Sequence, residues 1–289
     1  MQTTAPIAVT GATGTQGGAL ARLLLDRGHP VRALTRHPGS DAARALAARG
    51  AEVAQADFAD PASIKDALQG CRALFLMTTP FGTDADTEAA QGIASIDAAI
   101  AAGVEQLVFS SVAHADRGTG VPHFDSKYAV ERHLASTDLD WTVIGPAKFM
   151  DNYASGYAAR LLKEGKLALP LSPGRSIALV CAEDIAGMAA VALTDPGRLS
   201  GRRIDIAGEE LTGPEQAAAF SARLGWPVHF VPVPHEQARA WGEDLAAMFA
   251  YFDNVGLDVD TAALREEFPE VGWHTFADWL GTGNWPEER

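Results

Sequence analysis

Residues 7–25 read IAVTGATGTQGGALARLLL, and this stretch decides the fold class of the chain. Ile7 to Thr10 form a short apolar run with the character of a strand, and the apolar residues at 19, 20, 23 and 24 have the spacing of an amphipathic helix. Glycines at 11, 14 and 17 lie between the two. A glycine turn directly after a strand and directly before a helix predicts a loop that binds the phosphates of a dinucleotide.

Each glycine of this turn has its own steric role. Gly11 permits the tight turn, Gly14 lets the backbone approach a pyrophosphate, and Gly17 lets the helix pack closely on the strand. The helix N-terminus adds free N–H groups and a partial positive charge. The predicted cofactor contacts in the turn are Gly11, Ala12, Thr13, Gly14, Thr15, Gln16 and Gly17. The alternative is an ordinary connection between a strand and a helix, which this context disfavours.

Short apolar runs alternate with helical patterns through the first half of the chain, which is typical of a parallel sheet with helices on both faces. The six predicted strands are Ile7 to Thr10, Val31 to Thr35, Glu52 to Ala56, Ala73 to Met77, Gln106 to Ser110 and Trp141 to Gly145. Asp60-Pro61 has the form of an N-cap followed by proline at the first helical position. We therefore expect an α/β fold, a Rossmann-type doubly wound parallel sheet, over residues 1–150.

Residues 151–289 have more loops rich in Pro and Gly, and they predict a smaller C-terminal α+β lobe on the substrate or partner side. Its expected strands lie near Ser176 to Val180, Arg203 to Ile206 and Val228 to Val231. Helices are expected to start near Asp184, interpreted as an N-cap, and near Pro214. Helix 184–194 is the element of this lobe that could pack back on the first domain.

The composition limits the classes of function. Of 289 residues, 47% are hydrophobic and 21% charged, as in ordinary soluble proteins, and no run approaches the roughly 18 apolar residues of a membrane helix. The N-terminus lacks the pattern of a secretory signal, so we expect a cytoplasmic protein. A net charge of −14 with scattered Lys and Arg argues against direct nucleic-acid binding. Cys71 and Cys181 are expected to be reduced thiols, and the histidines lack metal-ligand spacing, so no metal site is predicted.

The end of the second strand, Thr35-Arg36-His37, bears on the choice between the two dinucleotides. Folds that bind NAD place a carboxylate here to accept a hydrogen bond from the ribose 2′-hydroxyl. Arg36 instead offers a guanidinium that can bind a 2′-phosphate through paired hydrogen bonds. We therefore expect NADP(H) to be preferred over NAD(H); the alternative is that Arg36 is a solvated loop residue.

Two further strand ends should line the path of the cofactor. Asp57 and Phe58 follow the third strand, where a carboxylate can accept a hydrogen bond from the adenine amino group and an aromatic ring can cover the base. Asp57 is alternatively a plain turn residue. Thr78, Thr79 and Pro80 end the fourth strand at the carboxyl edge of the sheet, where open α/β sheets bind their ligands.

The glycine turn, Arg36, Asp57-Phe58 and the segment HFDSKYAVE at 123–131 together resemble the NmrA-like group of atypical short-chain dehydrogenases/reductases, with the HSCARG-type proteins most similar. The resemblance extends over nearly the whole chain and includes IGPAKFMDN at 144–152, MFAYF at 248–252 and WHTFADWL at 273–280. It implies an NAD(P)-binding Rossmann domain with a small C-terminal lobe. It also implies two outcomes, which are reductases of quinones or dyes and redox-sensing regulators that bind the dinucleotide without turnover.

The resemblance adds site residues to those already named. They are Lys127, Phe149, Met150 and Asn152. By analogy with the family, Lys127 would hold the nicotinamide ribose, and the other three would border the nicotinamide ring.

The residues around Lys127 depart from the catalytic pattern of the larger superfamily. That pattern is Tyr-x-x-x-Lys, in which the ammonium lowers the pKa of the phenol and the tyrosine exchanges a proton with the substrate. Here His123 stands in the place of the tyrosine, and Tyr128 lies about 100° from Lys127 around the helix, so it cannot replace the lost phenol. His123 is a chemically possible acid, or alternatively a residue that begins or caps the helix. Val112 takes the position of the usual serine.

The sequence alone leaves two functions open. The first is an enzyme, an NADPH-dependent reductase of a quinone-like or other conjugated acceptor, because hydride transfer to an activated acceptor mainly requires an oriented cofactor. The alternative is a non-catalytic NADPH/NADP+ redox-sensing protein that acts through protein partners. The acceptor, any protein partner and the oligomeric state are not indicated by the residues.

Overall fold

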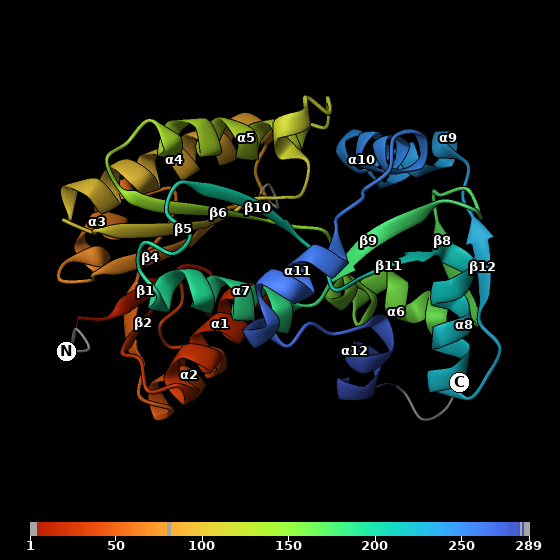
Figure 1. Ribbon diagram of the computed structural model, residues 1–289, viewed down its shortest axis with the longest axis horizontal. Helices are drawn as coiled ribbons and strands as arrows, with labels where there is room; N and C mark the ends of the chain where they lie inside the picture. Colours follow the sequence, from red (N-terminus) through yellow and green to blue (C-terminus); the bar gives the residue numbers. More distant parts are fainter. Residues whose placement is uncertain (1–4, 80–81, 284, 286–289) are drawn as a thin grey trace.

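The computed structural model describes residues 5–79, 82–283 and 285, and a seven-stranded parallel sheet lies at its centre (Figure 1). The strands are β1 (Ile7–Val9), β2 (Val31–Thr35), β3 (Glu52–Gln55), β4 (Ala73–Met77), β5 (Gln106–Ser110), β6 (Asp140–Pro146) and β10 (Arg202–Ile206). Their order is β10-β6-β5-β4-β1-β2-β3, so the chain winds outward from β1 first in one direction and then in the other. The predicted Rossmann-type doubly wound sheet is therefore confirmed.

The prediction of six strands, with Arg203 to Ile206 in the small lobe, is wrong. Strand β10 pairs in parallel with β6, from Arg202 opposite Thr142 to Ile206 opposite Pro146, and forms the edge of the central sheet. Polar contacts hold it there, since the Arg203 Nε donates to a carboxylate oxygen of Glu131 at 2.9 Å. The alternating pattern of a short strand does not reveal which sheet it joins, because both sheets bury one of its faces.

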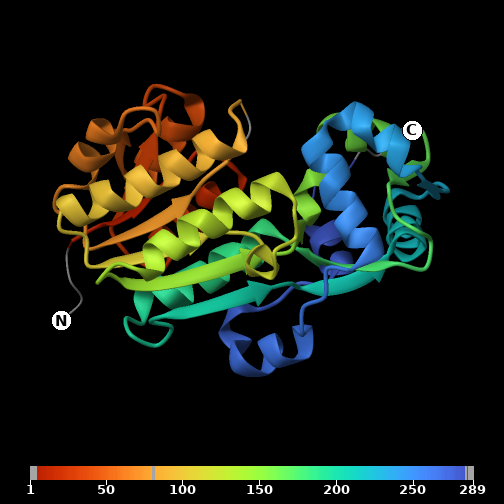
Figure 2. The same cartoon turned by 90° about the horizontal axis from the view of Figure 1, so that it is seen from above.

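Helices cover both faces of this sheet (Figures 1 and 2). One face carries α3 (Pro61–Leu68), α4 (Ala85–Ala101) and α5 (Pro122–Ala135), and the other carries α1 (Thr15–Asp26), α2 (Asp41–Ala48) and α7 (Ala182–Thr194). Asp60 caps α3 as predicted, because its carboxylate accepts the Ala62 N–H at 3.1 Å. No helix in the described part of the chain is both long and apolar enough to cross a bilayer.

Helix α7 packs beside α1 on the same face of the sheet, although it lies well beyond β6 in the sequence. The interpretation of Asp184 as its N-cap is wrong, because Cys181 occupies that position. Asp184 lies fully buried in the first turn, where it accepts the His274 backbone N–H at 3.2 Å and lies 2.6 Å from Nδ1 of the same residue. This carboxylate therefore ties the C-terminal segment to α7.

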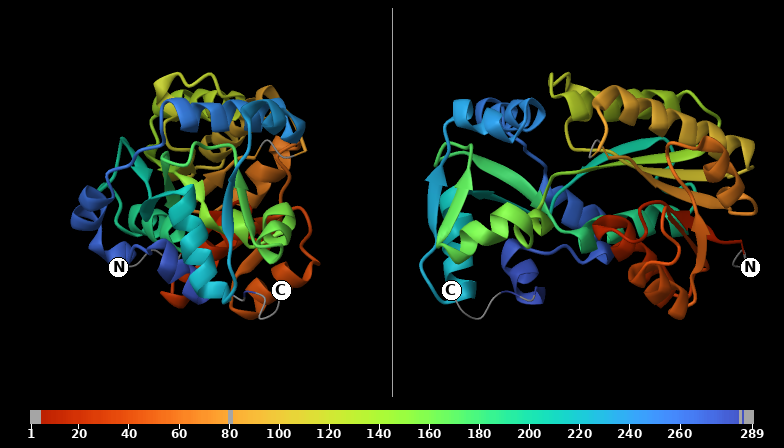
Figure 3. Two further views of the ribbon diagram at one scale, coloured as in Figure 1. Left: turned by 90° about the vertical axis from the view of Figure 1, so that its right-hand side faces the viewer. Right: turned by 180° about the vertical axis from the view of Figure 1, so that it is seen from behind.

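The remaining elements gather beyond the carboxyl ends of the central strands (Figures 1 and 3). Two small sheets contain β7 (Lys148–Phe149), β9 (Ser176–Val180) and β11 (Glu209–Thr212), and β8 (Lys166–Leu169) with β12 (His229–Pro232). The helices are α6 (Gly156–Lys163), α8 (Gly213–Leu224), α9 (His235–Ala238), α10 (Glu243–Asn254), α11 (Thr261–Glu267) and α12 (Phe276–Thr282). Short 3-10 turns are η1 (Ala115–Arg117), η2 (Met150–Tyr153), η3 (Arg239–Trp241) and η4 (Pro269–Val271). Helix α10 lies on the side of α4 and α5, and α12 on the side of α1 and α2 (Figure 3).

Two apolar clusters fill the two faces of the central sheet. The cluster beneath α3, α4 and α5 includes Leu74, Ile96 and Phe109. The larger cluster, beneath α1 and α7, continues without a break into the C-terminal elements and includes both Leu24 and Phe252. The boundary expected near residue 150 therefore does not coincide with a gap in the apolar core.

The connection from β1 to α1 leaves no room for a side chain at Gly17. A Cβ atom there would lie 2.5 Å from the carbonyl oxygens of both Thr10 and Gly11. Gly11 itself has a φ of +59°, in the left-handed region that glycine favours. The helix consequently begins in direct contact with the end of the strand, which sets the position of its N-terminus at the edge of the sheet.

Replacing Gly17 by alanine should therefore destabilise the protein by roughly 2–3 kcal/mol, because the backbone of the turn must move to admit the methyl group. Gly39→Ala is the matched control, since nothing lies within 4 Å of a Cβ placed there. Urea unfolding of both variants measures the difference in the free energy of unfolding. Equal stability of the two variants would contradict the close contact at Gly17.

Candidate functional site

The predicted dinucleotide contacts follow four neighbouring strands at their carboxyl ends. The turn 11–17 follows β1, Arg36 follows β2, Asp57 and Phe58 follow β3, and Thr78 follows β4. Because these strands are neighbours in the order β4-β1-β2-β3, their loops form one continuous row at the sheet edge that faces the C-terminal elements. Pro80, also predicted to contact the cofactor, lies outside the described residues.

The N-terminus of α1 has no side-chain cap. Gly14 occupies the N-cap position, its N–H donates to the Gly11 carbonyl at 2.9 Å, and the first turn holds no acidic residue. Thr13 and Thr15 are exposed beside it. Free N–H groups at a helix end favour an anion, and the exposed threonines show that this helix end is reached from solvent.

The glycine turn is fastened to β4 and β5 on either side. The buried Thr10 hydroxyl donates to the Phe75 carbonyl at 3.1 Å and accepts the Met77 N–H at 2.9 Å. On the other side, the Ser110 hydroxyl donates to the amide oxygen of Gln16 at 2.8 Å. The Gln16 side chain therefore supports the turn from inside, which leaves the backbone N–H groups to meet an anion.

The ends of β2 and β3 differ in how free their side chains are. Arg36 is exposed, and no carboxylate among the described residues pairs with it. Asp57 is half-buried and accepts the Ala59 N–H at 3.0 Å, which is the turn role that the sequence left open. Phe58 is half-buried against the cluster beneath α3. Arg36 is thus available to a phosphate, while one carboxylate oxygen of Asp57 is already engaged.

Lys127 lies in a buried network and has no free donor. Its Nζ is 2.8 Å from Oε1 of Glu88, 3.0 Å from the Thr78 carbonyl and 3.1 Å from the Thr78 hydroxyl. Glu88 is fully buried, and its second oxygen accepts the Ser126 hydroxyl at 2.6 Å. An ammonium has three N–H groups, and these three acceptors match them. Glu88 carries no signal in the sequence that would single it out.

His123 is held by a carboxylate from α10. Its backbone N–H donates to Oδ1 of Asp244 at 3.0 Å, and its Nδ1 lies 2.7 Å from Oδ2 of the same residue. His123 is the second residue of α5, after Pro122, so Asp244 caps the start of that helix. This arrangement supports the structural alternative, in which the histidine begins the helix, and it links α5 to the C-terminal elements.

The hydroxyls at the end of β5 are occupied. Ser110 bonds to Gln16 as described, and the Ser111 hydroxyl donates to Glu131. Val112, which follows, offers only its backbone carbonyl, which accepts from Arg203 at 2.9 Å. Position 112, where the resemblance to the short-chain dehydrogenase/reductase superfamily led us to expect a serine, therefore offers no hydroxyl to a substrate.

The three predicted nicotinamide neighbours occupy different environments. Phe149 is half-buried on β7 and Asn152 is exposed on η2, so both can meet a ligand. Met150 is fully buried in the larger apolar cluster, where the 3-10 turn directs its side chain inward. Its side chain therefore cannot border a nicotinamide in this conformation.

Lys148, beside Phe149, is a cation that sequence reasoning missed. No carboxylate among the described residues lies within ion-pair distance of it, and its Nζ lies 3.7 Å from the centroid of the buried Tyr153 ring. Burial lowers the pKa of Lys148 to about 7. The signal for Lys148 in the sequence was a lysine within an otherwise apolar segment.

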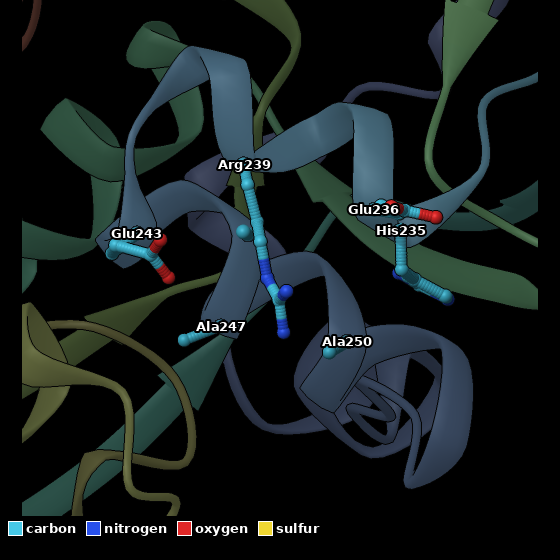
Figure 4. Close-up of a pocket in the computed structure, with 7 residues that line it drawn as sticks. His235, Glu236, Arg239, Glu243, Ala247 and Ala250 are labelled. Atoms are coloured by element: carbon cyan, nitrogen blue, oxygen red, sulfur yellow. The ribbon is translucent and has the colours of Figure 1, made fainter.

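A hollow of about 430 Å³ lies between α9, η3 and α10 (Figure 4). Its lining residues are His235, Glu236, Arg239, Glu243, Ala246, Ala247 and Ala250. Figure 4 shows the Arg239 side chain extending toward Ala247 and Ala250, with Glu243 to one side. None of the predicted cofactor contacts lines this hollow. One of its lining residues, Glu243, directly precedes Asp244, whose carboxylate accepts the His123 N–H.

One group of potential metal ligands comes together that the sequence did not indicate. Ligand atoms of Cys181, Asp184 and His274 lie within 4.8 Å of one another. In this structure they bond to each other, and burial raises the pKa of both the Cys181 thiol and the Asp184 carboxyl. The group serves here as the tie between α7 and the C-terminal segment.

The doubly wound sheet and the glycine turn at the start of α1 define the class of this protein, a Rossmann-type α/β protein. A profile of the NmrA-like family matches residues 3–280. The NAD(P)H azoreductase of Xenophilus azovorans is 34% identical over 240 residues, which cover 81% of this chain and 79% of that protein. This chain belongs to the NmrA-like family.

Solved structures agree with this membership. The NADPH-dependent quinone oxidoreductase QOR2 of Escherichia coli, complexed with NADPH, superimposes with a TM-score of 0.80 at 26% identity, over 95% of this chain and 98% of that one. NmrA, a negative transcriptional regulator in complex with NAD, gives a TM-score of 0.80 at 22% identity, over 97% and 95% of the two chains. The second likeness shows the fold alone.

The Lys148 environment predicts a pH dependence of stability. Between about pH 7 and the ordinary lysine pKa of 10.5, the unfolded chain holds a proton that the folded chain has released, so the free energy of unfolding should rise with pH through this window. Lys148→Met should remove the rise and should stabilise the protein at about pH 6 by roughly 1–3 kcal/mol, because the half-buried charge is then absent.

Urea unfolding at about pH 6 and about pH 9 measures the effect, and the exposed Lys65→Met is the control that should leave the profile unchanged. A profile of Lys148→Met that parallels the wild type would contradict this assignment.

Proposed function

We propose that this chain binds NADP(H) along the row of strand ends and catalyses the NADPH-dependent reduction of a quinone-like or other conjugated acceptor. The uncapped N-terminus of α1, held against β1 by Gly17, is the observation that carries the proposal, because it offers a pyrophosphate a set of free N–H groups. The two similar enzymes support the reaction class, since one is named an NAD(P)H azoreductase and the other an NADPH-dependent quinone oxidoreductase.

Binding would use the turn and the free side chains beside it. The turn 11–17 would seat the pyrophosphate, Arg36 the 2′-phosphate, and Asp57 with Phe58 the adenine. Thr79 would lie along the path of the cofactor, and Phe149 and Asn152 would border the nicotinamide. Bound NADPH would supply the hydride. These residues then act by orienting the reacting ring and by excluding water from it.

The state of the polar side chains favours an activated acceptor. Ser110, Ser111 and Lys127 are engaged within the fold, and His123 is held by Asp244. A simple ketone needs a proton donor poised at its oxygen during hydride transfer, whereas a quinone takes the hydride first and accepts its proton from water or from His123. The site therefore suits acceptors that are already electron-poor.

The second candidate function is a regulator that responds to the NADPH/NADP+ ratio. The contact between Asp244 and His123 is the observation that favours it, because it joins α5, beside the proposed cofactor site, to α10 in the C-terminal elements. A protein partner that docks on those elements would then sense occupancy of the site. Tight NADPH binding without turnover distinguishes this function from the reductase.

The proposed reductase should consume NADPH when offered quinones or azo dyes, and Gly14→Asp should abolish both binding and turnover. An aspartate at this N-cap places a carboxylate where the pyrophosphate would sit. Its Cβ would lie 3.2 Å from the Gly11 carbonyl oxygen, so a modest loss of stability is expected for any side chain at this position, charged or not. NADPH affinity by calorimetry, NADPH absorbance with each acceptor, and thermal unfolding give the three readouts.

Gly14→Asn is the matched control, since it has the same shape without the charge and should bind NADPH more tightly than Gly14→Asp. If wild-type protein binds NADPH but no acceptor causes its oxidation, the reductase proposal fails and the regulator is favoured. If Gly14→Asp binds NADPH as the wild type does, the proposed pyrophosphate site is wrong.

Arg36→Ala should weaken NADPH binding about 10- to 100-fold and leave NADH binding nearly unchanged, because charge-assisted hydrogen bonds to the 2′-phosphate are lost. Arg36→Lys, which keeps the charge without the planar fork, should bind NADPH with an affinity between those of the wild type and Arg36→Ala. Calorimetric titration with each dinucleotide measures the ratio of affinities. An Arg36→Ala protein that still prefers NADPH would overturn the assignment of Arg36.

A further inference from the structure

The buried network around Lys127 is closed, with each polar atom satisfied by the protein. The Thr78 hydroxyl donates to Oε1 of Glu88 at 2.8 Å, and the same oxygen lies 2.8 Å from the Lys127 ammonium. The other Glu88 oxygen takes the Ser126 hydroxyl at 2.6 Å. Lys127 is 8% exposed and Glu88 is 0% exposed. A ribose hydroxyl could bond to this ammonium only by displacing Glu88 or Thr78, which would leave a buried acceptor unpaired.

The backbone around Glu88 leaves little freedom for such an exchange. One turn further along α4, a Cβ at Gly92 would lie 2.6 Å from a methyl group of Val130 and 3.1 Å from the methyl group of Thr78. Helices α4 and α5 and the end of β4 therefore meet at one closely packed point. Glu88 and Lys127 span this point, and together they form a neutral pair that adds no net charge to the site.

From this point a short chain of contacts leads to the glycine turn. Lys127 holds the carbonyl of Thr78, and Met77, the residue before it, donates its N–H to the Thr10 hydroxyl at 2.9 Å. Thr10 immediately precedes Gly11, where an added Cβ would lie 3.0 Å from the Met77 sulfur. The position of the end of β4 therefore sets the position of the turn that is proposed to seat the pyrophosphate.

We propose that Glu88 is a positioning residue for the cofactor site, and that Lys127 acts as its counter-charge by holding the end of β4 rather than by binding the nicotinamide ribose. This inference rests on the proposed binding of NADPH. It assigns to Lys127 a role different from the one that the family resemblance implied, and it extends the site to α4.

The test is a double-variant cycle with Glu88→Gln, Lys127→Met and the combined protein. Affinities are measured for NADPH and for 2′,5′-ADP, which carries the adenosine phosphates but no nicotinamide ribose. Each single variant should lower the Tm by roughly 10 °C, since it leaves one buried charge unpaired. Asp97→Asn with His133→Gln is the matched control, an exposed α4–α5 pair 2.8 Å apart, and should change neither the Tm nor either affinity.

The combined protein distinguishes the two roles of Lys127. If Lys127 acts by holding the end of β4, the combined protein regains part of the Tm, and NADPH and 2′,5′-ADP lose affinity by a similar factor, because both ligands place a phosphate on the glycine turn. The ratio of the two affinities then stays within about threefold of wild type. If the ammonium holds the ribose, the Tm recovers but NADPH binding stays about tenfold or more weaker at unchanged 2′,5′-ADP affinity, and our proposal is overturned.

Glu88→Asp keeps the test decisive should the combined protein fail to fold. The shorter carboxylate loosens the end of β4, so our proposal expects NADPH and 2′,5′-ADP to bind more weakly by a similar factor. A ribose-binding Lys127 would instead be released, and NADPH would bind equally or more tightly. Wild-type protein that binds neither ligand would refute the proposed function itself, which is a separate outcome from any of these.

Discussion

The contact between the start of α1 and the end of β1 is the constraint on which the rest of the structure depends. Two carbonyl oxygens, of Thr10 and Gly11, occupy the space that a side chain at Gly17 would need. The helix therefore begins directly at the strand, and its N–H groups lie at the carboxyl edge of a sheet whose neighbouring strands end beside it. A helix end whose free N–H groups favour an anion at that edge therefore follows from packing alone, before any side chain contributes.

The polar residues around this edge are mostly used to hold it in place. Gln16, Ser110, Ser111 and Lys127 each bond within the protein, and His123 is fixed by Asp244. By contrast, Arg36 and Asn152 are exposed, and Phe149 is half-buried. A site built this way is well ordered for binding and poor in proton donors, and this combination accounts both for the proposed choice of acceptor and for the regulator as the second candidate.

The predictions that failed share one cause. The sheet membership of Arg203 to Ile206, the capping role of Asp184 and the expected place of the Met150 side chain beside the nicotinamide each depend on partners far away in the sequence. Asp184 has the residue type of an N-cap, but α7 begins at Ala182 with Cys181 as its N-cap, and the carboxylate of Asp184 meets His274 instead. Local patterns give the propensity of a segment, whereas these outcomes depend on what packs against it.

The sequence by itself determined the first six strands of the sheet, the turn at 11–17 and the start of α3 at Asp60, because hydrophobic period, glycine spacing and capping residues act over a few neighbours. Only the tertiary structure decided that Lys127 meets Glu88 and that His123 meets Asp244. The order of the strands places α4 beside α5, and α10 reaches the start of α5 from more than a hundred residues further along the chain. A buried charge must find a partner wherever the fold supplies one, and no local pattern specifies where that is.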